Sequence, residues 1–169
     1  MRTILDVQEE LIVDLIADGT SGISPAALEK DALVTEALRA ISEVSLPGFA
    51  LTFSGGTCLA KAYGLLERMS EDIDLRLQIE GYRMLSRSAL RRSLSELKKR
   101  MANAFSAAQF ALPDACIHAR NENRFISFEL AYHSRFPPDA ALRPNVRVEL
   151  MAIPPRLTPT RLMVTPLIR

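Results

Sequence analysis

Two aspartates, Asp72 and Asp74, lie one residue apart in a segment where polar and apolar side chains alternate strictly. Side chains two positions apart on a strand point to the same face, so the two carboxylates would lie side by side. A shared divalent cation, Mg²⁺ or Mn²⁺, relieves their mutual repulsion. Most such pairs are solvated residues of strand edges or turns. Here the apolar partners Ile73 and Leu75 indicate a strand packed on one side, which favours a metal site.

A third carboxylate is expected on a later strand. Glu149 is the best candidate, because the alternating apolar partners Val148 and Leu150 fix the face on which it lies. Glu129 has the same kind of surroundings and is the rival candidate. We therefore predict Asp72, Asp74 and Glu149 as catalytic and metal-binding residues, and the sequence barely separates Glu149 from Glu129.

A glycine turn, Gly55-Gly56-Thr57, precedes the carboxylates between an apolar segment and a helical pattern. The first two residues have no side chains to block a ligand, and the free N–H groups at the start of the next helix attract anions. A glycine pair alone more often marks an ordinary turn. Together with the two aspartates, the turn predicts a polyphosphate site.

Three further residues are candidates for nucleotide binding. Lys61 and Arg68 could neutralise phosphate charge, although ordinary exposed surface charge is an equal alternative for each. Ser70 is expected to stabilise the turn before Asp72 by a hydrogen bond from its side chain to the backbone.

Other chemistries have weaker signals. His118 and His133 have no partner at metal-ligand spacing, so we interpret them as ordinary strand residues. Cys58 and Cys116 also lack metal-site spacing, and we expect reduced thiols. The chain has no Gly-x-Ser-x-Gly elbow and no Cys-x-x-Cys pair.

The elements that position these residues follow from periodicity and turn formers. Ser24 and Pro25 are typical of a helix start, and that helix must end near Pro47-Gly48. This pattern predicts an α/β (α+β) fold, with a mixed sheet and flanking helices. The predicted helices cover residues 4–17, 24–46, 57–66 and 86–109, and the predicted strands cover residues 49–53, 72–77, 115–119, 124–133 and 145–153.

Length and composition limit the remaining possibilities. A chain of 169 residues with 48% hydrophobic content predicts a single domain over residues 1–169. The 21 basic and 20 acidic side chains exclude a polyanion binder of uniform charge, so any affinity for RNA must come from local clusters. The basic face of residues 87–100 is such a cluster, although a solvated helix face is the commoner case. Without a membrane-spanning or signal segment, we expect a cytoplasmic protein with no membrane partner.

The motifs together resemble a known family. The stretch from Phe53 to Tyr63 (FSGGTCLAKAY), followed by Arg68 to Leu75 (RMSEDIDL), resembles the AbiEii/AbiGii toxin family of type IV abortive-infection toxin–antitoxin systems. The resemblance implies that Gly55, Gly56 and Thr57 cradle nucleotide phosphates and that Asp72 and Asp74 hold the metal. It also implies, less specifically, that Arg147-Val148-Glu149 matches the family's later acidic strand.

The family also implies a sheet of the nucleotidyltransferase type, an activity and partners. We expect transfer of a nucleoside monophosphate from an NTP to an acceptor hydroxyl of tRNA or protein, and a cognate antitoxin. The alternatives are nucleotide binding without turnover and metal-dependent phosphohydrolysis. Family members continue into a helical half with a lysine motif that residues 1–169 lack, so the chain is either the N-terminal part of a longer protein or a departure from the family pattern.

Overall fold

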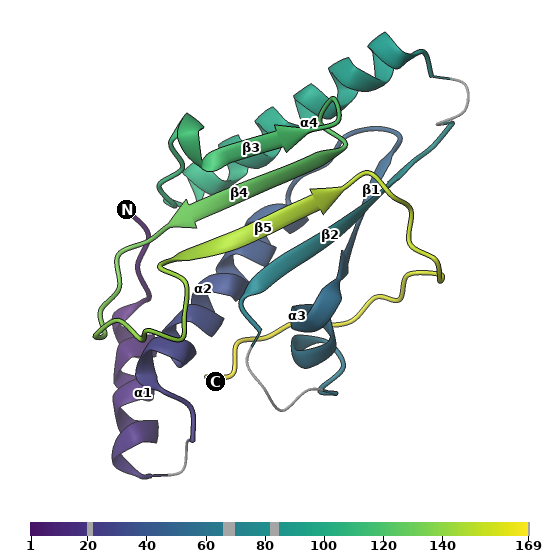
Figure 1. The fold of residues 1–169 in the computed structure, drawn as a ribbon. Coiled ribbons are helices and arrows are strands. Elements are labelled where there is room, and N and C mark those ends of the chain that lie inside the picture. Colours follow the sequence, from purple (N-terminus) through teal and green to yellow (C-terminus); the bar gives the residue numbers. More distant parts are fainter. Residues whose placement is uncertain (20–21, 66–69, 82–84, 169) are drawn as a thin grey trace.

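A computed structural model describes residues 1–19, 22–65, 70–81 and 85–168 (Figure 1). These residues form four α-helices, a short 3₁₀ turn at Asp114–Cys116, and a sheet. In chain order the elements are α1 (Asp6–Ala17), α2 (Pro25–Ser42), β1 (Phe49–Ser54), α3 (Gly55–Lys61), β2 (Asp72–Ile79), α4 (Arg87–Ala107), β3 (Ile117–Arg120), β4 (Phe125–Ala131) and β5 (Asn145–Met151).

The five described strands form one mixed sheet in the order β1-β2-β5-β4-β3. Strand β2 pairs in parallel with β5, whereas the other neighbouring strands are antiparallel. The sheet and its helices confirm the α+β architecture expected from the sequence. The parallel pairing brings residues 72–76 next to residues 147–151, two segments that are distant along the chain.

One face of the sheet packs into the hydrophobic core. The apolar residues of β2 and β5 are almost fully buried, because helices α2 and α4 lie against this face (Figure 1). The intervening polar residues of β2 and β5 are only half-buried and lie on the opposite face. Alternation therefore assigns Asp72, Asp74 and Glu149 to the side of the sheet away from α2 and α4.

The two long helices begin where the sequence predicts. Ser24 accepts a hydrogen bond from the backbone N–H of Ala27 at the start of α2, and Ser86 does the same for Ala89 in α4. The buried residues of α4 recur every three or four positions, as expected for a helix with one apolar face. They are Leu90, Leu94, Leu97, Met101 and Phe105.

Several predicted boundaries are wrong. Helix α2 ends at Ser42, before the proline that was expected to stop it. The glycine pair does not form a separate turn but occupies the first turn of α3, which ends at Lys61. Ala62 and Tyr63, predicted as helical, lie beyond it, and Leu66 lies outside the described residues. The strand predicted over residues 115–119 begins later, at Ile117, because a 3₁₀ turn occupies Asp114–Cys116, and the strand predicted over residues 124–133 is shorter at both ends.

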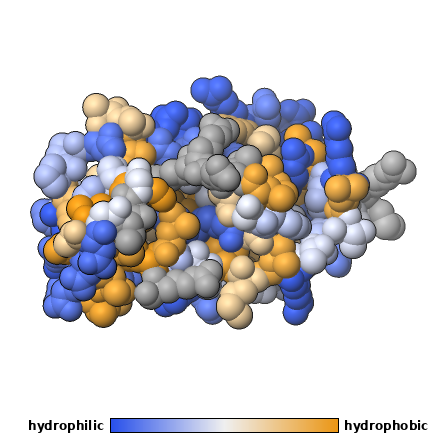
Figure 2. All heavy atoms as spheres, turned by 90° about the horizontal axis from the view of Figure 1, so that it is seen from below, coloured by the Kyte–Doolittle hydropathy of each residue, from blue (hydrophilic) through white to orange (hydrophobic). Residues whose placement is uncertain are grey.

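No helix among the described residues is both long enough and apolar enough to cross a membrane. Figure 2 views the molecule from below and shows hydrophobic side chains in several groups separated by hydrophilic ones. The exposed apolar residues of α3 and of the segment that follows it are Leu59, Tyr63 and Leu65.

Candidate active site

The predicted carboxylates meet on the face of the sheet opposite α2 and α4. Asp74 is the Cα partner of Glu149 on the neighbouring parallel strand, and Asp72 is the partner of Arg147. On its other side Asp74 is paired with Ser54, the last residue of β1. Glu129 lies one strand farther away, opposite Arg147. The register therefore places Glu149, rather than Glu129, next to Asp74.

Gly55 lies directly against the Asp74 carboxylate. Its φ is +78°, and a Cβ built on it would lie 2.8 Å from Cγ of Asp74 and closer still to Oδ2. A side chain at this position would be both strained and in collision. A Cβ on Gly56 would lie 3.1 Å from the Ser70 hydroxyl. The glycine pair thus lets α3 approach the acidic strand closely.

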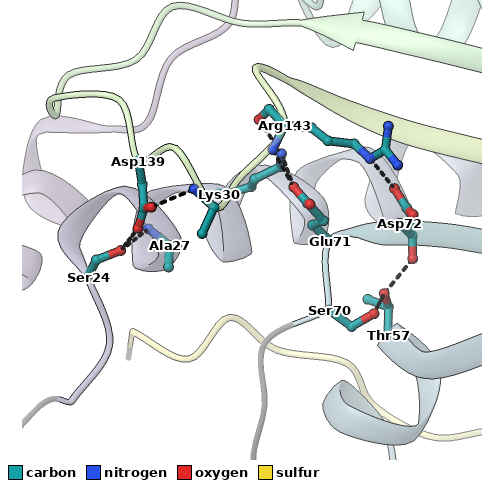
Figure 3. A network of polar contacts seen from close by, with 10 residues as sticks. Ser24, Ala27, Lys30, Thr57, Ser70, Glu71, Asp72, Asp139 and Arg143 are labelled. Atoms are coloured by element: carbon teal, nitrogen blue, oxygen red, sulfur yellow. Dashed lines mark hydrogen bonds and ion pairs between the residues drawn. The ribbon is translucent and has the colours of Figure 1, made fainter.

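Thr57 fixes α3 to the start of β2. Its side chain is buried, and its hydroxyl donates to the carbonyl oxygen of Asp72 (Figure 3). The Ser70 hydroxyl lies 2.8 Å from the Thr57 hydroxyl. Ser70 was expected to bond to the backbone, but it contacts the Thr57 side chain instead. Both residues connect the glycine turn to the acidic strand.

The carboxylates influence one another electrostatically. Burial raises the pKa of the Asp74 carboxyl, and the negative charges of Glu149 and Asp72 raise it further, while Arg76 opposes them. Crowded carboxylates of this kind are stabilised by a bound cation. The oxygen ligands that they offer are those that Mg²⁺ and Mn²⁺ prefer.

Two arginines lie close to these carboxylates. Arg143 Nε is 3.8 Å from Asp72 Oδ1, and Arg147 Nε is 3.0 Å from Glu149 Oε1. Neither contact has the geometry of a hydrogen bond, and Asp72 Oδ1 and Arg147 Nε are buried without a hydrogen-bond partner among the described residues. Within those residues no three acidic, histidine or cysteine side chains converge closely enough to hold a metal ion. The carboxylates fit a divalent cation in type and strand position, and the orphaned Asp72 oxygen lacks the partner that such a cation would supply.

Comparison with protein families decides the identity. Residues 36–169 match the family described as nucleotidyl transferase AbiEii toxin, type IV TA system. The chain belongs to the AbiEii family. The match includes the glycine turn, both aspartates and Glu149, and it confirms the resemblance seen in the sequence. The same comparisons find no matching curated protein and no matching solved structure.

Family membership makes this AbiEii chain a relative of nucleotidyl transferase toxins of type IV toxin–antitoxin systems. Not all the predicted phosphate ligands reach the site. The ammonium of Lys61 pairs with Asp31 of α2 at 2.5 Å, and the side chains are only 4% and 6% exposed. Burial lowers the pKa of Lys61, and Asp31 opposes that effect. A phosphate-binding role would require this buried ion pair to open. Arg68 lies outside the described residues.

Two important residues of the AbiEii chain were missed by sequence reasoning. Lys30 of α2 is fully buried and donates to Glu71, the residue before Asp72 (Figure 3). Arg143 lies in the segment before β5 and faces Asp72. The sequence gives only an indirect signal for Lys30: the first half of α2 has apolar residues on both sides of Glu29, Lys30 and Asp31, and these three charged residues are buried with them.

The remaining polar candidates form no second site within the described residues. His118 is an exposed residue of β3, and the backbone N–H of His133 donates to the carbonyl of Arg2. Both cysteines are free. Burial raises the pKa of Cys58, which disfavours a reactive thiolate.

Proposed function

We propose that this AbiEii-family chain transfers a nucleoside monophosphate from an NTP to an acceptor hydroxyl, with a divalent cation on Asp72, Asp74 and Glu149. The observation that carries the proposal is the pairing of Asp74 with Glu149 on parallel strands, directly beside Gly55. The family's own description as nucleotidyl transferases supports it.

In the proposed reaction the acceptor oxygen forms a bond to the α-phosphorus while the bond to the leaving pyrophosphate breaks. The bound cation supplies charge neutralisation for the phosphate oxygens. The chain holds the carboxylates on a rigid strand pair, fixes α3 beside them through Thr57 and Ser70, and brings the backbone of Gly55 and Gly56 to the reacting phosphates. These contributions are positioning and electrostatics, which dominate catalysis of phosphoryl transfer.

The proposed partners are an acceptor macromolecule and a cognate antitoxin. A type IV toxin–antitoxin family supports the antitoxin, and the proposed chemistry requires an acceptor with a free hydroxyl. RNA is the first candidate, because α4 presents basic side chains on its exposed face.

Radiolabel transfer tests the proposal. The purified chain is incubated with Mg²⁺ or Mn²⁺, each α-³²P-labelled nucleoside triphosphate and total cellular RNA, and label is measured in RNA and in protein. The doubly substituted variant Asp72→Asn/Asp74→Asn removes the charge of two of the three proposed cation ligands at nearly constant shape. Asp114→Asn, an exposed carboxylate in the 3₁₀ turn, is the matched control.

We expect wild type and the Asp114→Asn control to transfer label. The rate of transfer should be at least about a thousandfold lower in the doubly substituted variant, because the charged groups of the site are removed. Release of free nucleotide without labelled acceptor would instead indicate a phosphohydrolase. Nucleotide binding with no labelled product of either kind would indicate a binding protein without turnover.

A further inference from the structure

Arg143 lies beside Asp72 but is not part of the predicted nucleotide site. Its side chain is 52% exposed, and Nε is 3.8 Å from Asp72 Oδ1. Within the described part of the chain its guanidinium donates no hydrogen bond, so its donors remain available to a ligand. An arginine guanidinium is planar and binds phosphate oxygens with two parallel hydrogen bonds.

The backbone of Arg143 is held on both sides by one ion pair. Its N–H donates to Glu71 Oε2 at 3.0 Å, and its carbonyl accepts from Lys30 Nζ at 2.5 Å. Lys30 Nζ also donates to the same Glu71 oxygen (Figure 3). Glu71 immediately precedes Asp72, so the Lys30–Glu71 pair fixes Asp72 and Arg143 relative to each other. Figure 3 shows the guanidinium directed toward the Asp72 carboxylate.

This ion pair is unusual for its burial. The Lys30 side chain is 0% exposed, and that of Glu71 is 21% exposed. Burying a charged pair contributes little net stability, because the loss of hydration offsets the attraction. A buried pair that also holds two backbone groups serves better to fix geometry than to stabilise the fold. The geometry that it fixes is the position of a cation next to a proposed metal ligand.

The site needs such a cation. A triphosphate brings more negative charge to the carboxylates, and a divalent cation offsets only part of it. Two cations were predicted from the sequence for this role: Lys61 is buried and paired with Asp31, and Arg68 lies outside the described residues. Arg143 is half-exposed and lies on the open side of the acidic strand.

We propose that Arg143 binds the polyphosphate of the nucleotide and that the Lys30–Glu71 pair positions it beside Asp72. The inference rests on the proposed function and adds a specific ligand for the triphosphate. Arg143 is the binding residue, and Lys30 and Glu71 are positioning residues that act through it.

Equilibrium binding separates this role from a structural one. Mn²⁺ binding alone is measured by electron paramagnetic resonance, and binding of each nucleoside triphosphate with Mn²⁺ is measured by calorimetry. In Arg143→Gln we expect the Kd for the nucleotide to rise roughly tenfold to a hundredfold, the loss for one charged hydrogen-bonded contact. Mn²⁺ affinity should stay equal or increase, because a competing cation beside Asp72 is gone. Arg39→Gln, an exposed arginine of α2, is the control and should match wild type.

The outcomes distinguish the two proposals. A wild-type chain that binds neither Mn²⁺ nor any nucleotide overturns the proposed function, and this inference with it. If wild type binds nucleotide and Arg143→Gln binds it equally well, only the inference is overturned. A parallel loss of Mn²⁺ and nucleotide binding in Arg143→Gln would also overturn it, since that pattern indicates a disturbed site.

A double-mutant cycle tests the positioning residues. Lys30→Met should weaken nucleotide binding in the wild-type background but cause no further loss when added to Arg143→Gln. If Lys30→Met fails to give a cooperative thermal transition, Glu71→Gln takes its place, because it removes the charge but keeps an acceptor for the Arg143 N–H. Additive losses in the double variant would show that the pair does not act through Arg143.

Discussion

Asp74 is the residue of the proposed site where close packing and charge repulsion act together. Its carboxylate lies under Gly55, next to Glu149, and two residues from Asp72 on the same face. Burial and these two negative charges all disfavour its ionised form. A neutral side chain at this position would make the fold more stable. The ionised Asp74 carboxylate therefore lowers the free energy of unfolding.

Replacing Asp74 by Asn should therefore stabilise the fold at neutral pH. The folded pKa of Asp74 is raised above its usual value of 3.8, so the folded state holds this proton more tightly than the unfolded state. Stability then falls as the pH rises from about 3.8 through the raised pKa, and the penalty is complete above that pKa. We expect Asp74→Asn to raise Tm by roughly 2–4 °C at pH 7, the shift for about 1 kcal/mol in a chain of this size. The gain should shrink as the pH approaches 3.8.

The Tm of wild type and of Asp74→Asn, measured from pH 4 to pH 8, tests this prediction, with Asp114→Asn as the control. Mg²⁺ or Mn²⁺ should raise the Tm of wild type and leave that of Asp74→Asn unchanged, because the variant lacks a proposed ligand. An Asp74→Asn variant less stable than wild type at pH 7 would show that the ionised Asp74 carboxylate does not destabilise the fold.

At the scale of elements, helix α2 connects the segments around the site. Three consecutive charged residues of α2, Glu29, Lys30 and Asp31, are buried, and each bonds to a different part of the chain. Glu29 accepts from the backbone N–H of Arg135 at 2.8 Å, and Lys30 bonds to Glu71. Asp31 pairs with Lys61 at the end of α3, and it also accepts from the backbone N–H of Leu167. Through these bonds α2 fixes the loop after β4, the start of β2, the end of α3 and the C-terminal segment.

Lys61→Met should thus lower the stability of the fold, whatever its effect on nucleotide binding. It leaves Asp31 as an uncompensated buried charge, which costs about 3–5 kcal/mol in unfolding free energy. The double variant Lys61→Met/Asp31→Asn should recover much of that loss, because the charge is gone and an acceptor for Leu167 remains. Urea titration measures both effects.

Arg39→Met is the matched control, because the exposed Arg39 side chain pairs only with Glu36 of the same helix, at 3.7 Å, among the described residues. That change should cost no more than about 0.5 kcal/mol. A Lys61→Met variant with unchanged stability but weakened nucleotide binding would favour the phosphate-binding role predicted from the sequence.

At the scale of the whole molecule, charge is unevenly distributed although the net charge is only +1. The N-terminal half of α4 lines a hollow of about 1090 Å³ together with Glu122 of the β3–β4 connection. Arg87 pairs with Glu122, but among the described residues Arg91, Arg92 and Lys99 have no ion-pair partner. Unpaired arginines in a hollow lined with serines suit the phosphate backbone of an RNA acceptor.

RNA binding should therefore depend on salt through this face. Substituting both arginines, Arg91→Gln/Arg92→Gln, should reduce the slope of log Kd against log salt concentration by about 1.4–1.8, since each phosphate contact contributes about 0.7–0.9. Filter binding of total RNA between roughly 50 and 200 mM salt measures the slope. The pair Arg156→Gln/Arg161→Gln, exposed in the C-terminal segment, is the control for net charge. Equal slopes in both variants would assign the affinity to overall charge instead of α4.

Much of the architecture was determined by local sequence. Period-two alternation placed Asp72, Asp74 and Glu149 on the polar faces of their strands. The apolar stripe of α4 predicted the bounds of that helix to within a few residues. These patterns are local, because each side chain's direction depends only on the backbone of its own element. The family was recognisable for a related reason: the glycine turn and the Ser-Glu-Asp-Ile-Asp segment lie close together in the chain.

Tertiary structure decided which of those residues meet. Parallel pairing of β2 with β5 selected Glu149 over Glu129, and nothing in the alternation of either strand specifies its neighbour. Lys61 was predicted as a phosphate ligand or an exposed surface charge and is buried in a pair with Asp31, while Arg143 reaches Glu71 from 72 positions away. A charged side chain in a sequence has many possible partners. Once the side chain is buried, it must have one of them, because an unpaired buried charge costs several kcal/mol. That choice depends on how helices pack on the sheet, which local periodicity does not encode.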